Sequence, residues 1–173
     1  WNHKGDTVID ASSGLFCVPL GHGRKEIADA VHQQLLKLDY SPSFQVSHLP
    51  AFACAEKVAK LLPGDLNNVF FTICGSTAID SAIKIVQAYQ HAIGQAHRMK
   101  FVSRERAYHG VNIGGTSLSG MIKNREIFTA AMPGVIHLRH TWLDENKFTK
   151  GQPEHGAHLA DDLQRFVDMY GPE

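Results

Sequence analysis

The sequence has few cysteines, no excess charge of either sign and no long apolar run. Its three cysteines, Cys17, Cys54 and Cys74, are widely separated, which favours reduced thiols over a disulfide framework. Seventeen acidic residues balance 17 basic ones, which argues against a general binder of nucleic acid or of a membrane surface. No apolar stretch approaches the roughly 20 residues of a membrane span, and residues 1–4 do not have the pattern of a signal peptide. We therefore expect a soluble protein of the cytoplasm.

Helical and strand-like segments alternate along the 173 residues, without internal repeats. Apolar residues at helical spacing predict helices over 25–38, from Pro50 to the Pro-Gly pair at 63–64, over 76–93 and over 159–170. β-Branched and aromatic residues predict short strands at 8–11, 15–18, 69–72, 100–103 and 135–138. The two glycines in 114–117 predict a tight turn. This alternation predicts an α/β fold with a parallel or mixed sheet, and ligands at the carboxyl ends of its strands.

The junction between a predicted strand and a helix, at residues 69–78, has the residue types of a phosphate site. Gly75 allows a ligand to approach the backbone, and Ser76 and Thr77 are helix-capping residues with hydroxyl groups. The free N–H groups at the start of a helix favour an anion. Many turns of this kind carry Gly-Ser and bind nothing, so the junction alone leaves both interpretations open.

A second motif follows the next predicted strand. Tyr108, His109 and Gly110 come after the strand at 100–103, so we expect them at the same edge of the sheet as the phosphate site. An aromatic ring beside an anion site suggests a phosphorylated heteroaromatic cofactor, with Tyr108 or His109 stacked on its ring.

Two other sets of side chains have residue types typical of metal or catalytic sites. His137 and His140, and likewise His155 and His158, have the i, i+3 spacing of metal ligands, but neither pair has an obvious third ligand. Cys74 and His109 could form a thiol nucleophile, but no third group is present to orient them. We therefore expect no metal and no catalytic thiol.

Six segments follow one another along nearly the whole chain. They are Gly-Leu-Phe at 14–16, Gly-His-Gly-Arg-Lys-Glu-Ile at 21–27, Leu-Asp-Tyr-Ser-Pro at 38–42, Pro-Gly-Asp-Leu-Asn at 63–67, Phe-Phe-Thr at 70–72 and Tyr-His-Gly-Val-Asn-Ile at 108–113. Together they resemble the class III pyridoxal-phosphate aminotransferases, in the branch of the omega-amino-acid (β-alanine):pyruvate transaminases. The resemblance implies the N-terminal, incomplete part of a fold-type I PLP-dependent transferase, with a mixed, mostly parallel sheet flanked by helices. It implies that residues 1–50 contribute to the small domain and the subunit contact, and that 51–173 begin the large PLP-binding domain.

The same resemblance implies pyridoxal 5'-phosphate (PLP) as the cofactor and assigns roles to single residues. The implied cofactor-binding residues are Cys74, Gly75, Ser76, Tyr108 and His109, and the implied substrate-pocket residues are Leu15 and Phe16. The backbone N–H groups of Gly75 and Ser76 and the Ser76 hydroxyl would hold the phosphate, while Tyr108 would stack on the pyridine ring. Phe16 falls where the omega branch usually has tryptophan, and it would shape the amine pocket.

The chain departs from the family pattern at the strand–helix junction of residues 69–78 and in its lysines. Ile73, Cys74 and Thr77 stand where family members usually have Asn or Asp, Ser and Glu. None of the ten lysines matches the catalytic position of the family, so the Schiff-base lysine is expected beyond residue 173 and no catalytic residue is assigned here. Lys84, about 12 Å from Ser76 by helical rise, is expected to be a solvated helix residue.

The resemblance implies that the parent protein is a PLP-dependent aminotransferase. It would transfer an amino group from an omega-amino acid or amine of the β-alanine type to pyruvate, as a homodimer or tetramer with active sites shared between subunits. The fragment alone is expected to be inactive. The alternative is a non-catalytic, truncated or degenerate paralogue that binds PLP weakly or serves only as a dimerisation partner.

Overall fold

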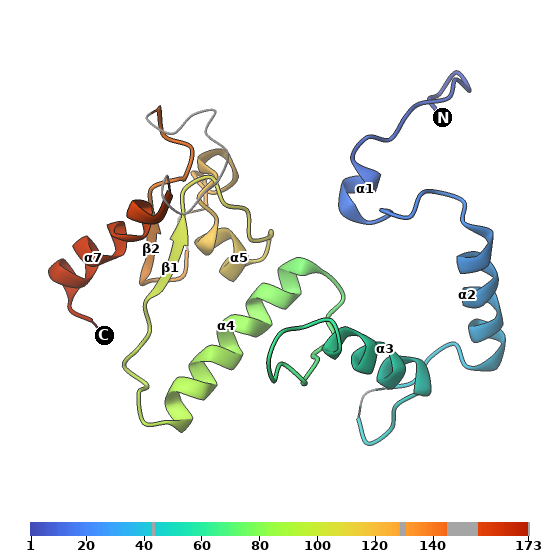
Figure 1. Ribbon diagram of the computed structural model, residues 1–173, viewed down its shortest axis with the longest axis horizontal. Coiled ribbons are helices and arrows are strands. Elements are labelled where there is room, and N and C mark those ends of the chain that lie inside the picture. The colour runs from blue at the N-terminus through green and yellow to red at the C-terminus, as the bar shows by residue number, and fades with distance from the viewer. Residues whose placement is uncertain (43, 129–130, 145–155, 173) are drawn as a thin grey trace. The chain divides into compact units, whose positions relative to one another are not determined.

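The computed structural model describes residues 1–42, 44–128, 131–144 and 156–172 (Figure 1). The chain divides into two compact units, Trp1–Val69 and Phe70–Glu173. The predicted domain boundary between residues 50 and 51 stays a prediction. Among the described residues, no helix is both long and apolar enough to cross a membrane.

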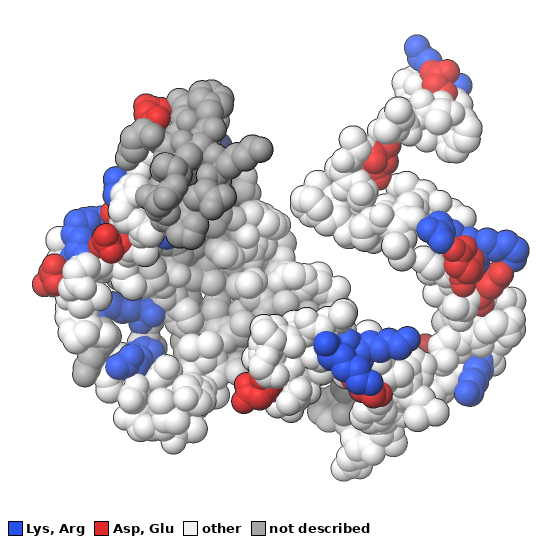
Figure 2. Space-filling model, viewed as in Figure 1, with Lys and Arg blue, Asp and Glu red and all other residues white. Residues whose placement is uncertain are grey.

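The first unit contains three helical segments in its described part: α1 (Ser13–Phe16), α2 (Lys25–Lys37) and α3 (Leu49–Ala59). The predictions of the two longer helices are confirmed. Glu26 in the first turn of α2 and Lys37 in its last turn both suit the helix dipole. Lys25 pairs with Asp29 at 2.6 Å, and Figure 2 shows basic and acidic side chains next to one another on this helix.

The apolar faces of α2 and α3 are exposed. On α2, Ile27, Val31 and Leu35 are 46–54% exposed, and Phe52 on α3 is 63% exposed. Phe52 lies on the apolar face of α3 that its helical spacing predicts to be buried, and in this chain that face is exposed. The spacing of apolar residues shows which face of a helix can be buried, but burial requires a second layer, and the described residues of this unit supply none.

Three predicted strands are absent from the described residues. The segments 8–11 and 15–18 form no strand, and the second begins within Ser13–Phe16, a left-handed turn with φ between 54° and 73°. The segment 69–72 has no strand partner, and Phe70 and Phe71 are 71% and 53% exposed. Residue types typical of strands are not sufficient, because a strand also needs a neighbour for its N–H and C=O groups.

The second unit carries the sheet. Its elements are α4 (Gly75–Ala92), β1 (Phe101–Arg104), α5 (Ile113–Leu118), η1 (Ile122–Asn124), β2 (Val135–Leu138), η3 (Ala157–Ala160) and α7 (Asp162–Tyr170). The strands β1 and β2 pair in parallel, with Phe101 opposite Val135. The predicted strands at 100–103 and 135–138, the final helix and the α/β class are confirmed.

The segment 114–117 was predicted as a turn and is instead the body of α5. Its glycines allow close packing rather than a change of direction. A Cβ atom on Gly114 would lie 2.7 Å from Cδ1 of Ile83 on α4, and one on Gly115 would collide with the carbonyl oxygen of His109. Glycine is common in turns, but here it allows α5 to pack closely against α4.

The core of the second unit is small in its described part. Ile83, Leu138 and Leu159 are its buried apolar side chains, and Ser117 and Ser119 are buried polar ones. The Ser117 hydroxyl has a partner as donor and as acceptor. It donates to the Ile113 carbonyl at 2.6 Å and accepts the Met132 N–H at 2.8 Å. This buried network holds α5 and the segment before β2 together.

Candidate functional site

The first N–H groups of α4 have no backbone acceptors in the described chain. Cys74 is extended, with φ −164°, and the Thr72 hydroxyl donates to its carbonyl oxygen at 3.1 Å. The first backbone hydrogen bond of the helix is from Ala78 to Cys74, which leaves the N–H groups of Gly75, Ser76 and Thr77 without backbone acceptors in the described chain. A Cβ atom on Gly75 would meet nothing within 4 Å. The 18-residue helix therefore opens toward free space with the donors and dipole that favour an anion.

The segment after β1 packs against this helix start. The Val111 N–H donates to Oγ of Ser76 at 3.0 Å. Gly110 has φ +110°, and a Cβ atom there would lie 2.7 Å from Ser76 Oγ and 2.8 Å from Ser76 Cα, so only glycine allows the approach. Because the Ser76 hydroxyl accepts this bond, its own O–H remains available as a donor. The structure thus brings together the two motifs that the sequence placed at one edge of the sheet.

Tyr108 and His109 are held differently. His109 is half-buried, with Nε2 3.0 Å from Oγ of Ser103 on β1, and its backbone N–H donates to the buried Ser119 at 3.1 Å. The ring of His109 therefore bonds to the sheet. Tyr108 is 56% exposed and leaves its ring available to a ligand. Of the two aromatic side chains, Tyr108 is the one that can stack on a bound ring.

The sequence did not single out the residues that fix this arrangement. Ser103 and Ser119 hold His109, and Oδ1 of Asp80 accepts the Gly115 N–H at 3.3 Å, which joins α4 to α5. One signal was present for Asp80. It lies among the apolar positions Ile79 and Ile83 on one side of an amphipathic helix, where an acidic residue needs a specific partner. The serines gave no such signal.

Two of the residues that depart from the family pattern contact each other. Sγ of Cys74 lies 3.4 Å from Oγ1 of Thr77. This hydrogen bond, followed by the Thr77 backbone N–H, lowers the pKa of the Cys74 thiol below its usual value, although slight desolvation opposes the shift. Cys74 thus points its sulfur at the first turn of α4. The third departure, Ile73, is 94% exposed.

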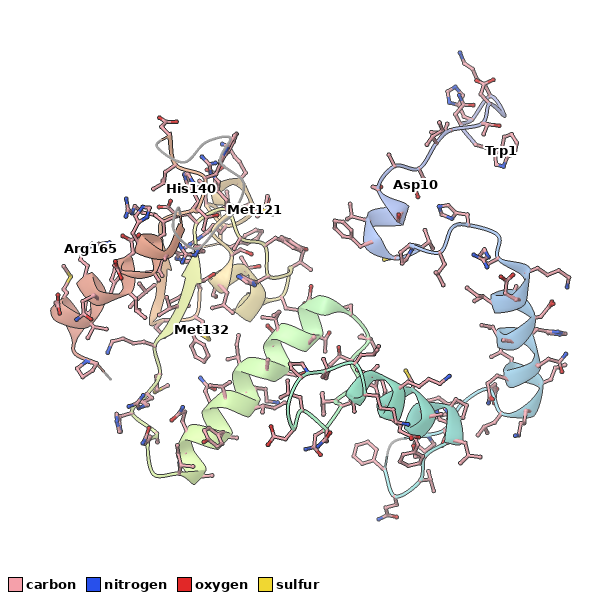
Figure 3. All side chains as sticks on the ribbon, viewed as in Figure 1. Trp1, Asp10, Met121, Met132, His140 and Arg165 are labelled. Atoms are coloured by element: carbon pink, nitrogen blue, oxygen red, sulfur yellow. The ribbon has the colours of Figure 1, made fainter. Side chains whose placement is uncertain are left out.

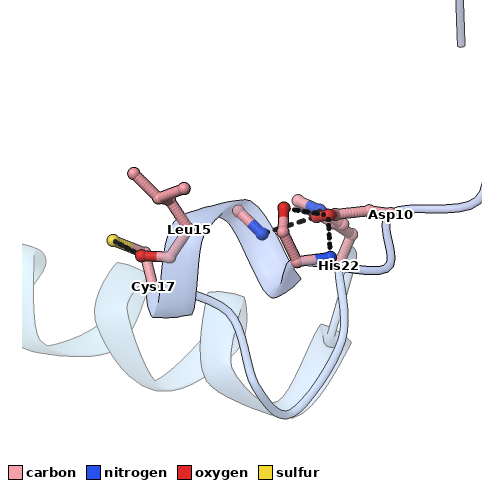
Figure 4. A network of polar contacts seen from close by, with 6 residues as sticks. Asp10, Leu15, Cys17 and His22 are labelled. Atoms are coloured by element: carbon pink, nitrogen blue, oxygen red, sulfur yellow. Dashed lines mark hydrogen bonds and ion pairs between the residues drawn. The ribbon is translucent and has the colours of Figure 1, made fainter. Parts of the chain in front are cut away.

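In the first unit, a hydrogen-bond network centred on a carboxylate lies at one end of the left-handed turn (Figure 4). Oδ1 of Asp10 accepts the backbone N–H and the hydroxyl of Ser12 at 3.0 and 2.9 Å, and Oδ2 accepts the Gly14 N–H at 2.6 Å. Nε2 of His22 lies 2.8 Å from Oδ2. Hydrogen bonds from His22 and then Ser12 lower the pKa of the Asp10 carboxyl to about 2. The predicted pocket residues Leu15 and Phe16 lie on this turn and are 74% and 86% exposed.

The described residues contain no group of three His, Cys, Asp or Glu side chains that could hold a metal ion. The ring of His137 contacts the Arg125 guanidinium and the Ser119 carbonyl. Figure 3 labels His140, whose N–H donates to Glu105 at 3.3 Å. His155 lies outside the described residues.

Known proteins resemble the chain over nearly its whole length. The family described as Aminotransferase class-III matches residues 1–168. The omega-amino acid–pyruvate aminotransferase of Pseudomonas putida is 48% identical over 168 residues, which cover 96% of this chain and 37% of that protein. The omega-aminotransferase of Caulobacter vibrioides is 46% identical over 164 residues, which cover 94% of this chain and 37% of that protein.

A solved structure supports the fold. The omega transaminase of Pseudomonas jessenii in complex with PMP matches with a TM-score of 0.88 at 32% identity, over 98% of this chain and 38% of that chain. The fold prediction is confirmed by this match, and the resemblance inferred from the sequence is confirmed by the family match. The chain spans less than two-fifths of the length of these three proteins. The chain belongs to the class III aminotransferase family.

Proposed function

We propose that the protein containing this chain is a PLP-dependent aminotransferase, and that Cys74, Gly75, Ser76, Tyr108 and His109 form part of its cofactor site. The observation that carries the proposal is the 3.0 Å hydrogen bond from the Val111 N–H to Ser76. It joins residues 108–111 to the start of α4, where the N–H groups of Gly75, Ser76 and Thr77 have no backbone acceptors. A phosphate site and an aromatic ring are thereby brought to one place, as a phosphorylated aromatic cofactor requires.

The residues present fit the phosphate and the ring of PLP. The N–H groups of Gly75 and Ser76 and the Ser76 O–H can donate to phosphate oxygens, and the open space at Gly75 admits the group. Tyr108 would lie against the pyridine ring, and His109, held by Ser103, would keep that segment in place. When bound, PLP supplies an electron sink for the carbon that gains or loses the amino group. This chain would bind and orient the cofactor.

The cysteine in the loop changes how the phosphate is held. A serine hydroxyl in its place could donate to a phosphate oxygen, whereas Sγ of Cys74 is bonded to Thr77 and is a weak donor. The backbone donors at Gly75 and Ser76 do not depend on that side chain. We therefore infer that backbone N–H groups and the Ser76 hydroxyl hold most of the phosphate in this protein.

For the substrates we propose an omega-amino acid or amine of the β-alanine type as donor and pyruvate as acceptor. The support is the similarity to an omega-amino acid–pyruvate aminotransferase over 96% of the chain. Leu15 and Phe16 would line the amine pocket. The proton-shuttling Schiff-base lysine would come from beyond residue 173, and the enzyme would be a homodimer or tetramer of the cytoplasm.

A serine-to-alanine pair on α4 tests the proposal in the full-length protein. Ser76→Ala removes one hydroxyl donor to the phosphate, which predicts PLP binding weakened by about tenfold or more. Ser81→Ala on the same helix is the matched control and should bind PLP as the wild type does. Binding is measured by titrating the apoprotein with PLP and following its visible absorbance, and activity by alanine formed from β-alanine and pyruvate.

Two outcomes contradict the proposal. If Ser76→Ala and Ser81→Ala bind PLP equally well, Ser76 is not a phosphate ligand. If the wild-type protein binds PLP but forms no alanine from any amine, the non-catalytic paralogue is the correct interpretation.

A further inference from the structure

We propose that Asp10 and His22 are positioning residues that hold the left-handed turn Ser13–Phe16 and thereby determine which amines the enzyme accepts; this inference rests on the proposed function. Figure 3 shows Asp10 beside α1. The residues lie in the first unit and do not belong to the proposed cofactor-binding set.

The turn is unfavourable without outside support. Ser13, Leu15 and Phe16 have φ of 54°, 57° and 73°, a region that residues with a side chain adopt rarely and seldom consecutively. Its own backbone hydrogen bonds are from Phe16 to Ser12 at 3.0 Å, from Val18 to Ser13 at 2.9 Å and from Cys17 to Ser13. Several consecutive residues in this conformation persist only where the surroundings determine it, and such positions are common at functional sites.

Asp10 supplies the support from the N-terminal side. Its carboxylate accepts the Ser12 N–H, the Ser12 hydroxyl and the Gly14 N–H, so both oxygens face the start of the turn. A short polar side chain that caps nearby backbone donors stabilises a local turn against extended backbone. The lowered pKa of Asp10 agrees with a carboxylate that stays ionised while it accepts these bonds.

His22 closes the network from the C-terminal side. It stands between Gly21 and Gly23, which have φ of +94° and +67°, and these glycines let the chain bend so that Nε2 reaches Asp10 at 2.8 Å. The contact spans 12 residues and encloses the whole turn between its two ends. The turn is therefore held by a single carboxylate that contacts both of its flanks (Figure 4).

The turn sets the direction of the two predicted pocket side chains. Leu15 and Phe16 are 74% and 86% exposed, so the backbone of the turn, rather than packing, orients them. If the turn relaxed to extended backbone, consecutive side chains would point to opposite sides. Loss of Asp10 should therefore alter the shape of the amine pocket without removing any group from it.

Asp10→Ala in the full-length holoenzyme tests the inference. We expect the ratio of kcat/KM for β-alanine to that for a bulky aromatic amine, 1-phenylethylamine, to change by about tenfold, mainly through KM. Adding Ser13→Gly to Asp10→Ala should bring the ratio back toward the wild-type value, because glycine adopts the left-handed region at no steric cost. If Asp10 had only a general structural role, Ser13→Gly would not restore the ratio in Asp10→Ala.

A second readout does not depend on activity. Hydrogen exchange of the amides of residues 12–18 should become about tenfold faster or more in Asp10→Ala, since the turn opens more often. Asp6→Ala is the matched control, because Asp6 accepts a hydrogen bond from Asn2 at 2.8 Å and contributes nothing to the turn. Its ratio and exchange should equal those of the wild type. His22→Ala, at an exposed side chain, should shift both readouts in the same direction by a smaller factor, and it carries the test if Asp10→Ala does not fold.

The outcomes separate this inference from the proposed function. An active wild type whose ratio is unchanged in Asp10→Ala overturns this inference alone, and so does a changed ratio without faster exchange at the turn. A wild type that transfers no amino group from either amine overturns the proposed function and, with it, this inference.

Discussion

Replacing Gly110 by alanine tests the contact between the Tyr108 segment and the start of α4. The new Cβ atom would lie 2.8 Å from Cα of Ser76, so the segment must move by roughly 0.7 Å to reach an ordinary carbon–carbon distance. Overpacking of this kind costs about 1–3 kcal/mol, and the φ of +110° costs an L-residue about 1–3 kcal/mol more. We therefore expect a loss of about 2–6 kcal/mol in the stability of the apoprotein. PLP binding should weaken as well, because the move separates Val111 from Ser76.

Variants of two other glycines separate the cost of the close contact from the cost of the positive φ and from the effect on PLP binding. Gly94 has φ +78° and open space around its Cβ position, so Gly94→Ala should lose only the backbone part, about 1–3 kcal/mol. Gly75 also has open space, and its φ is not in the left-handed region. A methyl group at Gly75 points back toward the N-terminal side of the helix, where the phosphate would bind. Gly75→Ala should therefore keep the stability of the apoprotein and weaken PLP binding by about tenfold or more.

The assays are urea unfolding of the full-length apoprotein and titration with PLP. If Gly110→Ala unfolds at the same urea concentration as Gly94→Ala, the close contact with Ser76 costs nothing and the expected extra loss of stability is refuted. The reasoning about Gly75 is refuted if Gly75→Ala binds PLP as tightly as the wild type does.

Three further predictions follow from the exposed residues. Lys84→Ala should leave the amino-transfer rate of the full-length enzyme unchanged, and a loss of activity would show that this lysine takes part. The pKa of Asp10 in the folded chain is about 2, below its usual 3.8. Asp10 should therefore stabilise the turn fully above pH 3.8 and lose this effect as the pH falls toward 2. An NMR titration of Asp10 with its midpoint near 3.8 would contradict this. Residues 1–173 expressed alone should be inactive and self-associate through exposed apolar faces such as that of Ile27, Val31 and Leu35, and a stable monomer in ultracentrifugation would refute this.

Segments with a regular pattern were predicted well. The helix over 25–38 and the helix after Gly75 follow from apolar residues at helical spacing, and the strands at 100–103 and 135–138 follow from β-branched residues. Predictions failed where a short segment depended on distant contacts. The segment 69–72 has strand residues but no strand partner in the described chain, and 114–117 became a helix because Gly114 and Gly115 could approach α4 and the carbonyl of His109.

Some residues of the candidate site could likewise be predicted from the sequence, and others could not. Gly75, Ser76 and Tyr108 could be named from the sequence, because a glycine at the start of a helix and an aromatic residue after a strand carry their chemistry locally. The partners of His109 could not be named. Ser103 and Ser119 are six and ten residues away from it, and their role depends on how the chain returns after β1.

The sequence by itself determined the family, the main helices, the two paired strands and the residues that could hold a phosphate, because periodicity and short motifs are local properties. Only the tertiary structure decided that Val111 bonds to Ser76, that His109 faces Ser103, and that Asp10 and His22 enclose a left-handed turn. These contacts join residues 6 to 35 positions apart. Their formation depends on the path of the chain between the two partners, and no local pattern records that path.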